Sequence, residues 1–116
     1  MICALIIAFT VNMSQVTEAS NKLDVLITSA ITKPNKDYSK DIEYIRSIIG
    51  YVNANNTINN IDSAKIGTIM SLYNQILYEI EAYQQTKDER FLKSIITNKL
   101  FADNLLDSID TNKKGS

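Results

Sequence analysis

Apolar residues recur three and four positions apart along most of this chain, a pattern typical of helices with one face against a core. The longest such stretch covers residues 61–109 and predicts two long helices joined by a tight polar turn. The apolar positions of the first helix are Ile61, Ile66, Ile69, Met70, Leu72, Tyr73, Ile76, Leu77, Ile80 and Tyr83. They cover so much of its circumference that we expect a central helix with several neighbours, capped at its start by Asn59 or Asn60.

The turn between these two helices carries a helix-start signal. Thr86-Lys87-Asp88-Glu89 matches a capping box, in which the Thr86 and Glu89 side chains each accept a hydrogen bond from the other residue's amide. This predicts a second helix that begins near Lys87 and lies antiparallel to the first, because the link is short. Its apolar positions are Phe91, Leu92, Ile95, Ile96, Ala102, Leu105, Leu106 and Ile109.

Two shorter segments before this hairpin also have helical periodicity. The first has Val16, Ala19, Leu23, Leu26, Ile27 and Ala30, and it ends before Pro34. The second has Tyr38, Ile42, Ile45, Ile49 and Val52, with Asp37 or Ser39 as cap, Gly50 near its end, and an asparagine-rich loop over residues 53–60. Four helical segments with short links predict an all-α fold, a small up-down-up-down bundle of about four helices.

The N-terminal segment has two interpretations. Residues 2–11 are almost wholly apolar and precede a polar stretch and Ala19, which is the layout of a secretory signal peptide over residues 1–19. No lysine or arginine precedes the apolar run, so the alternative is a buried first element of a cytosolic domain. The run is shorter than the roughly 20 residues of a membrane-spanning helix, so we expect no permanent membrane span after cleavage. The helical domain is expected over residues 20–110, followed by a polar tail over 111–116.

Composition limits the chemistry. The 116 residues suit one domain, with 45% hydrophobic and 22% charged residues, and the net charge of -1 gives no basic field for nucleic acid. The chain has no histidine, its only cysteine is Cys3, and its three glycines are too far apart for a phosphate-binding loop. We therefore expect no catalytic, cofactor-binding or metal-binding residues and no enzyme. An enzyme would have to work with carboxylates, lysine and tyrosine alone.

Four residues are candidates for partner binding. Tyr44 and Tyr78 lie off the apolar stripes of their helices, so both should be exposed, and exposed aromatic residues are frequent at binding surfaces. Asp103 and Asp107 share a helix face near a C-terminus, where like charges are unfavourable. The two aspartates are expected to face a cation or a basic partner, or else to form an ordinary solvated acidic face.

Two stretches resemble known families. Asn59-Asn60-Ile61-Asp62-Ser63-Ala64-Lys65 and the helix after it resemble the central region of small poxviral Bcl-2-like proteins, which implies a cytosolic all-helical inhibitor of host signalling or apoptosis. Residues 73–109 resemble small bacterial bundle proteins such as secretion chaperones and bacteriocin immunity proteins. The chain departs from the Bcl-2-like pattern because it lacks tryptophan and has fewer helical segments than that fold. Neither family is assigned.

These observations favour a non-enzymatic protein–protein interaction module. The first hypothesis is an exported helical bundle, secreted or periplasmic, that acts as an inhibitor, adaptor, immunity factor or chaperone. The alternative is a cytosolic helical regulator, viral and Bcl-2-like among the options, that binds an amphipathic helix of a host target. In both hypotheses the partner is another protein, no cofactor is needed, and the oligomeric state is open.

Overall fold

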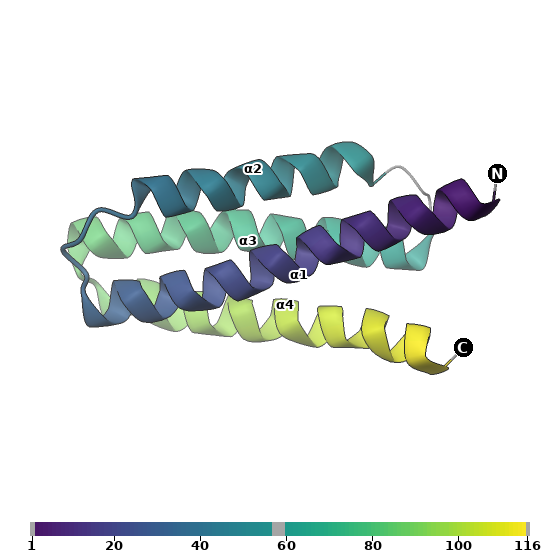
Figure 1. Ribbon diagram of the computed structural model, residues 1–116. Helices are drawn as coiled ribbons and strands as arrows, with labels where there is room; N and C mark the ends of the chain where they lie inside the picture. The colour runs from purple at the N-terminus through teal and green to yellow at the C-terminus, as the bar shows by residue number, and fades with distance from the viewer. Residues whose placement is uncertain (1, 57–59, 116) are drawn as a thin grey trace.

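The protein folds as an all-α bundle of four helices in the computed structural model, which describes residues 2–56 and 60–115, with side chains over 13–56 and 60–109. The helices are α1 (Ile2–Thr32), α2 (Ser39–Asn55), α3 (Ile61–Thr86) and α4 (Glu89–Gly115). They run alternately in opposite directions, so α1 begins at the end of the bundle where α4 finishes (Figure 1). The elongated molecule measures 49 × 25 × 19 Å. The predicted fold class is confirmed.

Helix α3 is the centre of the bundle, as the broad spread of its apolar positions predicts. It packs against α1, α2 and α4. Its buried residues are Ile66, Ile69, Met70, Tyr73, Ile76, Leu77, Glu79 and Ile80. The prediction for Ile61 was wrong: this side chain is largely exposed. Ile61 is the first residue of α3, five positions before Ile66, which is the first buried residue of this helix.

Helix α1 is longer than the apolar spacing alone predicts. It continues without a break from Ile2 to Thr32, through the polar stretch before Ala19. Met13, Val16 and Ala19 are all buried in the bundle core, whereas the side chains of residues 2–12 are outside the described ones. A chain that began at Ser20 would therefore lack three core side chains. Among the described residues, no helix has the length and hydropathy needed to cross a membrane.

The link between α3 and α4 differs from the predicted capping box. Thr86 is the last residue of α3, and its hydroxyl donates to the Ala82 carbonyl oxygen at 2.8 Å. Lys87 then closes α3 in the left-handed conformation, with φ of 56°. The Asp88 carboxylate accepts a hydrogen bond from the Arg90 amide at 2.9 Å and so caps α4. The prediction was wrong because the left-handed residue takes the chain out of α3 before the cap of α4 forms.

The ends of α2 are partly as predicted. The residue at the cap position is Tyr38, not Asp37 or Ser39, and its side chain caps no amide. The Asp37 carboxylate still accepts a hydrogen bond from the Ser39 amide at 2.9 Å just before the helix, and the predicted apolar face is buried. Gly50 does not end α2, which continues to Asn55 and shortens the predicted loop over residues 53–60. Ile49 before Gly50 and Val52 after it are buried in the core, and this packing outweighs the low helix propensity of glycine.

The cap at the start of α3 is as predicted, whereas α4 extends further than predicted. The Asn60 side chain accepts a hydrogen bond from the Ser63 amide at 2.8 Å, so the predicted cap is confirmed there, whereas Asn59 is outside the described residues. Helix α4 continues to Gly115, so most of the expected tail over residues 111–116 is helical in its backbone.

Candidate functional site

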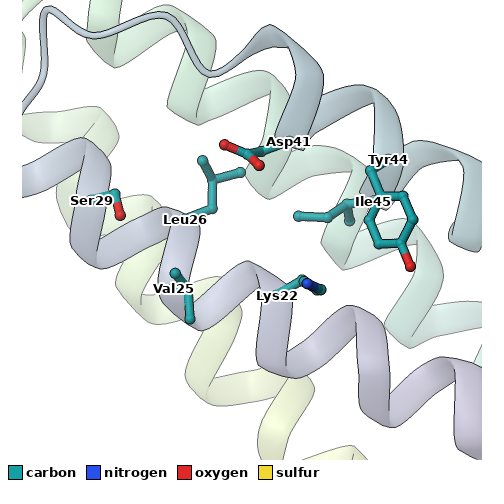
Figure 2. Close-up of a pocket in the computed structure, with 7 residues that line it drawn as sticks. All are labelled: Lys22, Val25, Leu26, Ser29, Asp41, Tyr44 and Ile45. Atoms are coloured by element: carbon teal, nitrogen blue, oxygen red, sulfur yellow. The ribbon is translucent and has the colours of Figure 1, made fainter.

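An open groove separates the exposed sides of α1 and α2 (Figure 2). Its lining residues from α1 lie three and four positions apart, and so do those from α2, which places each set on one helix face. The lining residues are Lys22, Val25, Leu26, Ser29, Asp41, Tyr44 and Ile45. The groove encloses about 360 Å³. The groove therefore runs along the two antiparallel helices.

The groove has a buried apolar floor and a partly apolar rim. Leu26 of α1 and Ile45 of α2 are both buried and point toward each other between the helices (Figure 2). Above them Val25 is 65% exposed and Tyr44 is 47% exposed. Exposed apolar surface beside a preformed depression is typical of a protein-binding site.

Tyr44 is held in place from α1. Its hydroxyl donates a hydrogen bond to the Glu18 carboxylate at 2.5 Å, and the Lys22 ammonium nitrogen lies 5.6 Å from the ring centroid. The hydrogen bond to Glu18, and then its negative charge, raise the pKa of the Tyr44 hydroxyl above its ordinary value. These two contacts therefore hold the ring of Tyr44 at the edge of the groove.

The polar groups of the groove have both signs of charge. Lys22 projects from the α1 wall and Asp41 from the α2 wall, and Asp41 is the only carboxylate among the lining residues. In the described part of the chain, no three Cys, Asp or Glu side chains cluster to hold a metal ion. The arrangement offers shape, apolar area and two orienting charges.

The four predicted partner-binding residues lie in three places. Tyr44 lines the groove, Tyr78 is on the outer surface of α3, and Asp103 and Asp107 are on α4. The predicted exposure of both tyrosines is confirmed. Sequence reasoning missed Val25, although it too is a large apolar residue off the apolar stripe of its helix. A search for every large apolar residue off its stripe, not for aromatic residues alone, would have found it.

Asp103 already has a partner inside the chain. The buried Lys99 ammonium lies 2.8 Å from the Asp103 carboxylate, 2.7 Å from that of Asp24 and 3.2 Å from the Ser20 hydroxyl. Burial alone would lower the pKa of Lys99, but its hydrogen bonds and charge interactions with the two aspartates outweigh this and raise it. Asp107 is exposed, without an ion-pair partner among the described residues.

Two more polar groups are buried along α3. The Glu79 carboxylate accepts hydrogen bonds from Ser94, from Asn98 at 3.0 Å and from Gln75 at 3.4 Å, which fixes α3 against α4. The Tyr73 hydroxyl makes no hydrogen bond of ordinary geometry within the described part of the chain. Burial raises its pKa, with the nearby Ser20 and Lys99 acting in the opposite direction. Both groups face the core and belong to its packing.

Comparisons with known proteins give no assignment. No protein-family model matches this chain, and neither the curated proteins nor the solved structures gave a match. The resemblances to Bcl-2-like and small bacterial bundle proteins therefore rest only on the residues quoted for them.

Proposed function

We propose that this protein is a non-enzymatic interaction module that binds an amphipathic helix of another protein in the groove between α1 and α2. The observation that supports this is the buried Leu26–Ile45 floor beneath the exposed side chains of Val25 and Tyr44. Helix-in-groove recognition uses an apolar trough that takes side chains spaced three and four residues apart on the partner.

The groove suits such a helix in size and charge. A volume of about 360 Å³ accommodates a few large apolar side chains rather than a whole folded surface. Lys22 and Asp41 stand on opposite walls, so a partner helix with an acidic residue on one edge and a basic residue on the other would be oriented by them. The apolar floor supplies affinity, and the two charges supply direction.

The segment before Ala19 takes part in this site. Glu18 holds the Tyr44 hydroxyl, and Val16 and Ala19 are buried in the core. Cleavage after Ala19 would remove all three. We therefore propose the uncleaved chain as the binding form, and we favour the cytosolic regulator over the exported inhibitor, adaptor, immunity factor or chaperone.

Site-specific photo-crosslinking in the cells of origin tests the proposal. A photoreactive amino acid replaces Val25 in the groove or, as a matched control, Tyr78 on the outer surface of α3. We expect one discrete protein adduct from position 25 and none from position 78, with the crosslinked residues of the partner in a helical segment. Adducts from position 78 alone, or equal adducts from both positions, would contradict the groove as the binding site.

A further inference from the structure

A second apolar surface lies on the outer face of α4. Ile96 and Leu100 are both more than half exposed there. They are four residues apart, so their side chains lie one turn from each other on the same face. Next to them runs a second groove, between α1 and α4, lined by Asp24, Ile27, Thr28, Ile96, Lys99, Leu100 and Asp103.

Two unpaired charges on this face are symmetric about Leu100, whereas Lys99 and Asp103 are paired with each other. Lys93 and Asp107 lie seven residues to either side of Leu100, which is two turns or about 10.5 Å in each direction. Both side chains are exposed, and neither has an ion-pair partner among the described residues. A face with opposite charges at equal distances from an apolar centre is complementary to a second, antiparallel copy of itself.

We propose that two copies of this chain associate through antiparallel α4 helices, with Leu100 on the two-fold axis. In this arrangement Lys93 of each copy lies opposite Asp107 of the other copy, so the interface contains two such ion pairs. Leu100 of each copy then packs against Leu100 of the other copy, next to Ile96 and Ile27 at the edge of the groove between α1 and α4. The second copy thereby covers the exposed apolar residues of this face.

Other arrangements of the same two helices are less favourable. A parallel pair would place Lys93 against Lys93 and Asp107 against Asp107. An antiparallel pair centred between Ile96 and Leu100 would place Glu89 against Asp107. It would also place Lys93 against Asp103, but the charge of Asp103 is already balanced by Lys99 of the same chain. Like charges in contact are disfavoured, so the charges select the arrangement centred on Leu100.

This association is independent of the proposed partner groove. Val25 and Lys22 line the groove toward α2, whereas Asp24, Ile27 and Thr28 lie on the side of α1 toward α4. A dimer through α4 would leave the α1–α2 groove open in both copies. Partner binding in the α1–α2 groove and association through α4 can therefore be tested separately.

Analytical ultracentrifugation of the full chain tests the apolar centre. The wild type should show a concentration-dependent monomer–dimer equilibrium, which Leu100→Gln weakens at least about tenfold. Phe101→Gln is the matched control, because Phe101 is 53% exposed beside the 60% of Leu100 but lies about 100° around the helix. A chain that stays monomeric up to about 1 mM, or a dimer that responds equally to both variants, would overturn the proposal.

A charge reversal tests the orientation. Lys93→Asp and Asp107→Lys should each weaken the dimer, and the two together should restore it. In a Cys3→Ser background, Leu100→Cys should form an intermolecular disulfide under mild oxidation and Phe101→Cys should not. Circular dichroism of each variant is the control for folding. A dimer that the double reversal fails to restore, or equal crosslinking at both positions, would show that another surface associates.

Discussion

Lys99 shows how a single buried charge is stabilised in this bundle. Its side chain is only 6% exposed, yet two carboxylates and a hydroxyl lie within hydrogen-bonding distance. The aspartates are half-exposed and keep part of their hydration, so the cost of burial falls mainly on the lysine. The cluster joins α1 to α4 at a seam where the two helices otherwise have few contacts.

Removing this cation should destabilise the protein. In Lys99→Met the aliphatic stem still packs, but Asp24 and Asp103 are left as like charges without their shared partner. We expect the free energy of unfolding to fall by about 1–3 kcal/mol in urea denaturation. Lys40→Met in the exposed first turn of α2 is the control and should change stability by less than about 0.5 kcal/mol. Equal losses in the two variants would contradict a stabilising role for the cluster.

Lys99 and Tyr73 together predict how the free energy of unfolding changes at alkaline pH. Folding raises the pKa of Lys99 above 10.5 and that of Tyr73 above 10.0, so the folded chain holds these two protons more tightly than the unfolded chain. Their contribution is fully present at neutral pH and is lost as pH rises from about 10 through the raised values. Urea denaturation as a function of pH should show this decline, and it should be smaller in Lys99→Met.

Asp88 predicts the behaviour in acid. Its hydrogen bonds with Arg90, first from the side chain and then from the amide, lower the pKa of the carboxyl from 3.8 to about 2. The charged cap therefore stabilises the protein above pH 3.8, and this contribution is lost as the pH falls through about 2. Asp88→Ala should lower the melting temperature at neutral pH, and its difference from the wild type should shrink near pH 2. A constant difference across this range would contradict the role of the charge.

At the scale of the helices, the apolar periodicity was sufficient to predict the four elements but not their ends. The signal-peptide pattern of residues 1–19 is a local property, whereas the burial of Val16 and Ala19 depends on packing against the other helices. The turn between α3 and α4 was predicted, but the residues that close α3 and cap α4 were not. Left-handed backbone is uncommon for lysine, so nothing in the local sequence marks Lys87 as the residue that closes α3.

The length of α1 yields a prediction about truncation. A chain that starts at Ser20 loses Met13, Val16 and Ala19 from the core, and loses Glu18 from Tyr44. Its free energy of unfolding should be lower by at least about 2 kcal/mol in urea denaturation, because cavities replace buried side chains. Equal stability of the truncated and full chains would show that these residues are dispensable and would restore cleavage after Ala19 as a plausible maturation step.

At the scale of the molecule, the candidate site was only partly predictable. Tyr44 could be identified as exposed because it lies off the apolar stripe of its helix. Its position beside Lys22 and Glu18 could not, because it depends on the register of α1 against α2, which no short-range pattern encodes. Asp103 was singled out for an unbalanced charge, although Lys99 precedes it by four residues and this spacing already favours an ion pair within one helix. Only the contact of Lys99 with Asp24 depends on the packing of α4 against α1.

The groove predicts a specific loss of binding. Val25→Asp introduces a charge beside the apolar floor, so its affinity for the crosslinked partner should fall at least about tenfold, as measured by isothermal titration calorimetry. Because Val25 is exposed, the variant should keep the wild-type melting temperature. Tyr78→Asp, an exposed substitution on α3, is the matched control and should bind normally. Similar losses in both variants would mean that binding does not depend on the groove.

The most direct test of the proposed function is an NMR map of backbone amide shifts, recorded with and without the helical segment of the partner that crosslinks to position 25. Binding in the groove should shift amides on the facing sides of α1 and α2, around Val25, Leu26, Tyr44 and Ile45, and leave the outer face of α3 near Tyr78 unchanged. Shifts centred on α3, or no shifts at saturating segment, would contradict the groove as the binding site of this protein.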